Sequence, residues 1–162
     1  MTDTICTTLL GRPVPQNSDL TAEQSIDAFE ALCDALFRAF RADYQYFCAQ
    51  TSAERIERHA DAYAAWHTVH VSLSAVARIT SLMPALETAV DQLSNVFVMR
   101  LTKTKRHTVD SAALVREAGR LRSERGQDDR LADLLMQAGS YVQYSHDPSY
   151  PIPDINDLLD EA

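Results

Sequence analysis

Apolar residues recur every three or four positions from about residue 21 to 49, which places them on one face of a helix. Thr21 and Gln24 match a capping box at the start of this stretch. The sequence therefore predicts a long amphipathic helix over residues 21–49. Its predicted core face consists of Ile26, Phe29, Cys33, Leu36, Phe40, Tyr44 and Phe47.

A second capping box at Thr51 and Glu54 follows almost at once, so we expect a second helix that runs back antiparallel to the first. Its first half is amphipathic, but between residues 69 and 79 only Arg78 is charged. This half is therefore expected to be central in the fold or to lie in a subunit interface. Trp66, the single tryptophan, is expected to be a core anchor on this helix.

Proline removes a backbone donor and disfavours helix in the residue before it, so Pro84 is expected to start a third helix. Periodic apolar positions, a stop at Gly126 and an acidic start at Asp128 and Asp129 predict two more, over about residues 110–124 and 128–145. No strand-like alternation is long enough to build a sheet. The predicted fold class is all-α, an antiparallel bundle of about five helices.

The two ends of the chain have a different pattern from the predicted bundle domain, residues 21–147. Residues 1–20 carry Gly11, Pro13 and Pro15 without periodicity and predict an irregular N-terminal arm. Residues 148–162 form a proline-containing acidic tail in which three apolar residues can share one helical face. This tail is expected either to dock in a partner's groove or to fold back on its own domain. Its candidate interaction residues are Ile155, Leu158 and Leu159.

Composition limits the function classes. The 162 residues are 46% hydrophobic with no apolar run near the roughly 20 residues that a membrane span requires. The first residues lack the basic and apolar regions of a secretory signal, so a cytoplasmic protein with no membrane partner is expected. Three cysteines without CxxC spacing are expected to be reduced and mostly buried. Four scattered glycines exclude phosphate-cradling loops, and no cofactor is predicted.

The residues that could carry catalysis form no recognisable motif. His59, Tyr63, His67 and His70 could ligate a metal, but the inward carboxylates and Glu-x-x-His steps of a bundle di-metal site are missing. We expect histidines satisfied by hydrogen bonds at the core or its edge, and no metal site. No nucleophile has an assignable base, so no catalytic residue is predicted. A metal-dependent enzyme using His59, His67 and His70 is kept as an alternative.

Charge is distributed unevenly along the chain. Residues 100–125 hold eight Lys or Arg against three Asp or Glu, whereas the remainder holds seven basic and twenty acidic residues. Such asymmetry creates a local positive field that attracts phosphates or an acidic protein surface. The candidate residues for binding an anionic partner are Arg100, Lys103, Lys105, Arg106, Arg116, Arg120, Arg122 and Arg125.

Nucleic acid is a less favoured partner for this basic segment. The helix after Gly126 opens with Asp128 and Asp129, which phosphates would repel, and no aromatic residue is interleaved with the basic ones from 101 to 135. Backbone contacts by a nucleic-acid accessory protein are the alternative. The leading prediction is a non-enzymatic interaction or regulatory module that binds a protein partner and self-associates through the second helix. The acidic tail is further expected to lie against the basic segment and compete with the partner.

Overall fold

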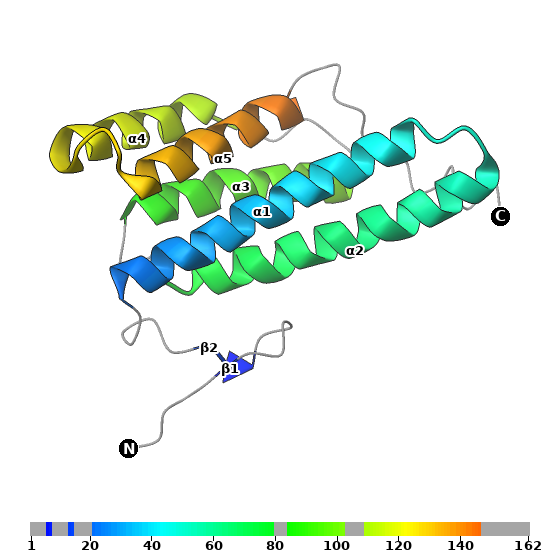
Figure 1. The fold of residues 1–162 in the computed structure, drawn as a ribbon, viewed down its shortest axis with the longest axis horizontal. Coiled ribbons are helices and arrows are strands. Elements are labelled where there is room, and N and C mark those ends of the chain that lie inside the picture. The colour runs from blue at the N-terminus through cyan, green and yellow to red at the C-terminus, as the bar shows by residue number, and fades with distance from the viewer. Residues whose placement is uncertain (1–5, 8–12, 15–20, 80–83, 103–108, 147–162) are drawn as a thin grey trace.

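The computed structural model describes residues 6–7, 13–14, 21–79, 84–102 and 109–146. It contains five helices: α1 (Ala22–Phe47), α2 (Ser52–Ala77), α3 (Pro84–Thr102), α4 (Ser111–Arg125) and α5 (Arg130–His146). Two residues of β1 (Cys6–Thr7) pair antiparallel with β2 (Pro13–Val14) inside the segment predicted to be an irregular arm. The predicted all-α class and the number of helices are confirmed (Figure 1).

Both predicted N-terminal caps form, in different ways. Thr21 Oγ1 accepts from the Gln24 amide at 3.1 Å, and Gln24 Oε1 accepts from the Thr21 amide at 2.9 Å, which completes the box. Thr51 Oγ1 likewise accepts from the Glu54 amide at 3.1 Å. The Glu54 carboxylate, however, accepts from the amide of Gln50, one residue before the cap, at 2.9 Å. The turn between α1 and α2 is thereby tied to the start of α2.

The later helices also begin and end where local chemistry requires. Pro84 opens α3, as predicted, since a proline needs no amide partner in the first turn. Asp110 caps α4 by accepting from the Ala113 amide at 3.3 Å. Gly126 ends α4 with φ 111° and ψ 165°, a conformation that is nearly restricted to glycine. Asp129 then accepts from the Ala132 amide at 3.0 Å in the first turn of α5.

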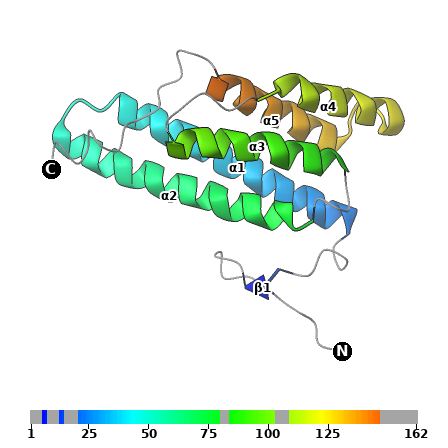
Figure 2. The ribbon, with the colours of Figure 1, turned by 180° about the vertical axis from the view of Figure 1, so that it is seen from behind.

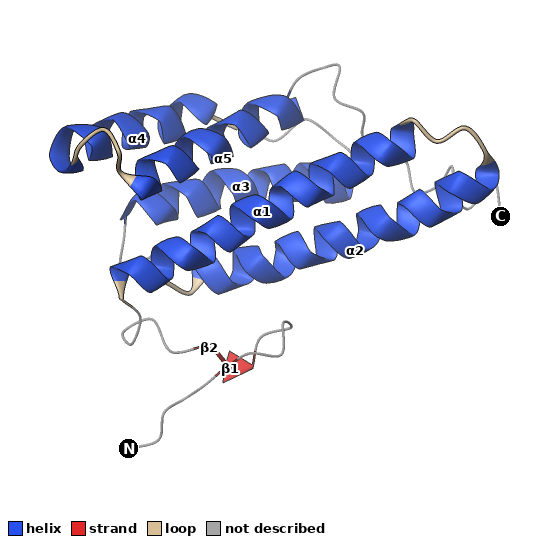
Figure 3. Cartoon of the chain, in the orientation of Figure 1, coloured by secondary structure: helices blue, strands red, loops and turns tan. Residues whose placement is uncertain are grey.

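The helices form two hairpins with α3 between them. In Figures 1 and 2, α1 and α2 run antiparallel side by side, and α4 and α5 form a second antiparallel pair. The chain direction alternates, so α1, α3 and α5 point one way and α2 and α4 the other (Figure 1). Short loops at residues 48–51 and 126–129 close both hairpins (Figure 3). Because α1 and α5 run parallel and in contact, their C-terminal ends lie at the same end of the bundle.

All five helices contribute to one apolar core, in which Leu36, Leu93 and Leu135 are almost completely buried. One side of the uncharged half of α2 is buried within the chain, as the central one of its two expected positions requires, whereas His70, Ser74 and Ala77 are exposed. Its buried side chains are Val69, Val71, Ser72, Leu73 and Val76. No helix in the described part of the chain is long and apolar enough to cross a membrane.

The two cysteines with described side chains differ. Cys33 is buried, and burial raises the pKa of its thiol to about 12, with a further contribution from the carboxylates of Asp34 and Glu30. Cys48 is exposed at the C-terminal end of α1. The expectation of a buried cysteine is therefore confirmed for Cys33 and wrong for Cys48, the C-cap residue of α1.

Candidate docking surface

The arginines of the basic segment that lie on α4 are engaged in ion pairs. Arg116 contacts Asp110 at 3.2 Å. Arg120 lies between the carboxylates of Glu117 and Glu124, at 2.8 and 3.1 Å, and these hydrogen bonds raise its pKa. All three partners belong to the same segment and are the three acidic residues already counted in its charge balance.

The remaining two arginines of α4 pair with carboxylates outside the segment. Arg122 contacts Asp133 of α5 at 2.8 Å, and Arg125 contacts Asp129 at 3.8 Å. The local excess of positive charge in the sequence is therefore reduced by acidic residues that the fold brings from α5 and its preceding loop. Of the other candidate residues, Lys103, Lys105 and Arg106 lie outside the described residues.

Arg100 does not share this surface, because its side chain is only 16% exposed and lies inside the bundle. Its Nε and Nη2 donate to Oδ2 and Oδ1 of Asp43 at 3.0 and 3.1 Å. Trp66 Nε1 also donates to Asp43 Oδ2 at 3.0 Å, and the Arg100 guanidinium lies 5.6 Å from the Trp66 ring centroid. These contacts connect α1, α2 and α3, and the expected core position of Trp66 is confirmed. Arg100 is thus a structural residue, which corrects its placement with the surface cations.

The histidines of α2 point to different surroundings. The ring of His59 lies 6.0 Å from that of Tyr46, and the ring of His70 stacks on Phe97 at 5.2 Å. His67 and His70 are exposed, and the contact with Phe97, which packs against the core, places His70 at the core's edge, one of the two positions expected for these histidines. Among the described residues no group of three or more His, Cys, Asp or Glu side chains could hold a metal ion.

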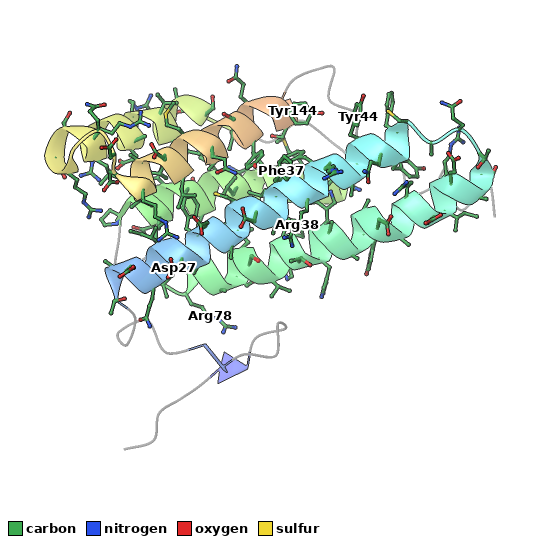
Figure 4. The ribbon with its side chains drawn as sticks, viewed as in Figure 1. Asp27, Phe37, Arg38, Tyr44, Arg78 and Tyr144 are labelled. Atoms are coloured by element: carbon green, nitrogen blue, oxygen red, sulfur yellow. The ribbon has the colours of Figure 1, made fainter. Side chains whose placement is uncertain are left out.

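The most conspicuous exposed feature is a group of aromatic rings where α1 meets α5. Phe37 is 54% exposed, Tyr44 is 57% exposed and Tyr144 is 38% exposed. We call Phe37, Tyr44 and Tyr144 the aromatic surface. Figure 4 shows Tyr44 and Tyr144 close together at the ends of α1 and α5, with Phe37 earlier along α1. Phe47, 66% exposed, extends the apolar area at the end of α1.

A packed aromatic layer supports this surface. Phe40 is buried and stacks on Tyr141 with ring centroids 5.6 Å apart, while Tyr144 and Trp66 meet its ring edge-on at 5.4 and 5.3 Å. Such aromatic pairs stabilise one another beyond their burial. Since Tyr144 is held against Phe40, at least one ring of the surface is fixed by the core beneath it.

Contacts along the α1/α5 pair position the two helices. At the start of α5, Arg130 reaches Asp27 at 2.8 Å and Glu30 at 3.1 Å, and these contacts raise the pKa of Arg130. In the middle, the Cys33 thiol donates to the Leu134 carbonyl at 3.8 Å. The parallel register that follows brings the last turn of α5 against α1 near Phe40.

The aromatic surface has both acidic and cationic neighbours: the Asp34 carboxylate is exposed three residues before Phe37 and contributes to the raised pKa of Tyr141. Arg41 is exposed and follows Phe37 by four residues and precedes Tyr44 by three, so it lies between them on α1. Arg38 is exposed on the adjoining side of α1. Neither arginine has an ion-pair partner among the residues that the structure describes. The side-chain hydrogen bond with Cys48 raises the pKa of Tyr44, and Tyr144 is near enough to contribute.

Sequence reasoning did not predict this surface. It placed Tyr44 and Phe47 on the core face of the first helix, and both are exposed because α1 continues past the region that α5 covers. One signal was present in the sequence: Phe37 directly follows Leu36, so the apolar stripe is wider than one face requires. Comparison of the chain with protein-family models, curated proteins and solved structures finds no match.

Proposed function

We propose that this protein is a non-enzymatic helical interaction module, and that it docks a partner on the aromatic surface of α1 and α5. The observation that carries the proposal is the group of three exposed aromatic rings from two helices, supported by the packed ring of Phe40. Aromatic residues and arginine are the side chains most enriched where interfaces gain their binding energy. A rigid ring also loses little conformational entropy when a partner covers it.

The expected partner is a protein segment that combines apolar and acidic side chains. Arg41, between Phe37 and Tyr44, has no carboxylate partner in the described part of the chain and can accept one from outside. An arginine at an aromatic site contributes a charge-assisted hydrogen bond and a flat stacking face. This retains the anionic partner that the sequence predicts and moves its principal contact from α4 to α1.

Docking through the basic segment itself stays a prediction. An external anion at Arg120 would have to displace Glu117 or Glu124, which already bind the guanidinium at 2.8 and 3.1 Å. The exchange of one carboxylate for another yields little net free energy, whereas Arg41 has no such contact to lose. The α1/α5 surface is therefore the better supported of the two locations.

Self-association through α2 is a separate part of the proposal. Tyr63 is 67% exposed on this helix, and the residues from 62 to 77 include no Asp, Glu, Lys or Arg, whereas the exposed Ile56 lies in the charged half of α2. An uncharged exposed helical face can pack on a second copy with little desolvation cost. Sedimentation velocity of the full chain and of Tyr63→Glu, over a concentration series, tests this directly. A single monomeric species at all concentrations of the unsubstituted chain would overturn it.

The docking proposal is tested with a displayed library of random 16-residue peptides, selected on the full chain. We expect enrichment of peptides with Asp or Glu and Leu, Ile or Phe. Phe37→Ser and Arg41→Glu should each weaken the selected peptides about tenfold or more, as the loss of an interface anchor does. The matched controls are Val115→Ser, at an exposed apolar residue of α4, and Arg78→Glu, at an exposed arginine at the C-terminal end of α2. They should leave binding unchanged.

Three outcomes would overturn the docking proposal. Selection that enriches no acidic, apolar peptides would show that the surface lacks the stated specificity, as would equal losses in the test and control variants. A single-stranded oligothymidine of 20 nucleotides is the competing probe, since aromatic rings with arginine also stack on bases. Oligothymidine binding that is lost in Arg41→Glu, without peptide binding, would assign the surface to nucleic acid instead.

A further inference from the structure

The last 16 residues of the chain have the chemistry expected of the docked partner. Residues 147–162 contain no Lys or Arg. Their carboxylates belong to Asp147, Asp154, Asp157, Asp160 and Glu161, and their aliphatic residues are Ile152, Ile155, Leu158 and Leu159. The same short segment thus offers both side-chain types that Phe37, Tyr44 and Arg41 would bind. It is also the segment to which sequence reasoning assigns an interaction role.

The attachment point of this segment lies at the aromatic surface. Helix α5 ends at His146, two residues after Tyr144, whose ring contacts Phe40 of α1. The distance along α1 from Tyr44 to Phe37 is about 10 Å at 1.5 Å per residue. A chain spans up to about 3.3 Å per residue, so a few residues suffice to follow it. Tethering of this kind gives an effective concentration on the order of millimolar.

Charge distribution favours this surface over the basic segment as the binding site of the tail. The described arginines of α4 already contact Asp110, Glu117, Glu124, Asp133 and Asp129. Arg38 and Arg41 contact no carboxylate among the residues with described side chains. An incoming acidic segment therefore gains new contacts on α1, whereas on α4 it would replace existing ones.

We propose that residues 148–162 bind the aromatic surface of their own chain and compete there with the external partner. This inference rests on the proposed function, because it takes the same surface as the docking site. The consequence is regulatory, because a partner must displace the tail. The partner's apparent affinity is reduced in proportion to the fraction of molecules in which the surface is uncovered.

The test uses the exposed thiol of Cys48, four residues after Tyr44, to carry a paramagnetic nitroxide in the full ¹⁵N-labelled chain with Cys6→Ser. We expect the amide signals of residues 152–160 to lose at least half of their intensity. In a triple variant that combines Ile155→Ser, Leu158→Ser and Leu159→Ser, these amide signals should regain their full intensity. Because the label itself adjoins Tyr44, the unlabelled triple variant provides a second readout, in which the amides of Phe37, Arg41 and Tyr44 should shift.

Three results would overturn the inference. The first is unchanged intensity over residues 152–160 together with unshifted amides on α1. The second is equal broadening of residues 152–160 in a mixture of two chains, one that carries the nitroxide without ¹⁵N and one that carries ¹⁵N without the nitroxide. This result would assign the contact to a second copy. The third is that the tail substitutions shift Arg116 and Arg120 instead of Arg41, which would place the tail on the basic segment.

A binding measurement separates this inference from the proposed function. If the tail covers the surface, the triple variant should bind a selected peptide at least tenfold more tightly than the unsubstituted chain. Equal affinities of the two chains, with binding still lost in Phe37→Ser, would overturn the tail as occupant and leave the docking surface supported. If neither Phe37→Ser nor Arg41→Glu weakens peptide binding, the proposed function itself is overturned.

Discussion

Asp43 of α1 and Arg100 of α3 form a bidentate ion pair inside the bundle, with N–O distances of 3.0 and 3.1 Å. The Asp43 side chain has no exposed surface, and Trp66 of α2 donates a third hydrogen bond to it at 3.0 Å. Three helices therefore meet at one carboxylate. This contact fixes α1, which carries most of the aromatic surface, relative to the other two helices of its half of the bundle.

Removal of one charge from this pair should be strongly destabilising. Arg100→Met removes both Arg100 hydrogen bonds from the buried Asp43 carboxylate, which costs about 3–5 kcal/mol of unfolding free energy. The double variant Asp43→Leu with Arg100→Met removes both charges and should recover a substantial part of that loss. Urea unfolding followed by circular dichroism measures both. A loss below about 1 kcal/mol in Arg100→Met would show that the pair is not a determinant of the fold.

Alanine substitution at Gly119, inside α4, and at Gly126, at the C-terminal end of α4, should change the stability of the protein in opposite directions. Gly119 lies inside α4, and a Cβ atom added there would meet nothing within 4 Å, so Gly119→Ala should stabilise the protein by about 0.5–1 kcal/mol. Gly126 has φ 111°, where a side chain is strained, so Gly126→Ala should destabilise it by about 1–3 kcal/mol. The shift of the thermal midpoint checks both signs. Equal effects would contradict the assigned end of α4.

The two thiols of α1 and its C-terminal end should differ in reactivity. In a Cys6→Ser background, the exposed Cys48 should react with a disulfide reagent at pH 8 within minutes, whereas the native-state Cys33 should not. The pKa of Cys33 is raised to about 12 by burial, so folding favours its neutral form. Its contribution to stability is complete below pH 9 and is lost as the pH rises from 9 towards 12. Rapid release of two equivalents from native protein would contradict the burial of Cys33.

Two phenylalanines three residues apart should separate stability from binding. Phe40 is 6% exposed and contacts three aromatic rings, so Phe40→Ala should cost about 3–5 kcal/mol of unfolding free energy. Phe37 is 54% exposed, so Phe37→Ala should cost less than about 1 kcal/mol. Chemical denaturation gives both values. A large loss for Phe37→Ala would mean that its ring supports the core instead of being available to a partner.

Local sequence signals predict the helices of this fold well, because each boundary has its own chemistry. Thr21 with Gln24, Pro84 and Gly126 each act within a few residues. In the structure the first two mark the start of a helix and Gly126 marks an end, as expected. Five side chains in the half of α2 without charges, between residues 69 and 76, are buried, as its apolar composition indicates. These features need no knowledge of which helix packs against which.

The candidate site depends on long-range packing that local patterns do not contain. Asp43 follows Leu36 by seven residues and so occupies a core-facing position, a signal that a buried carboxylate needs a cation partner. Its partner Arg100 is 57 residues away, and proximity in sequence alone groups it with the surface cations. The exposure of Tyr44 likewise depends on where α5 ends relative to α1, which follows from the parallel α1/α5 register.

The affinity of one selected acidic peptide for four full-length chains tests the docking claim most directly. Fluorescence anisotropy would compare the unsubstituted protein and the triple tail variant with Phe37→Ser/Arg41→Glu and with the control Val115→Ser/Arg78→Glu. We predict a loss of at least about 100-fold for Phe37→Ser/Arg41→Glu, since two interface anchors are removed, and a change below about twofold for the control. Equal affinities of these two double variants would contradict the assignment of the aromatic surface as the docking site.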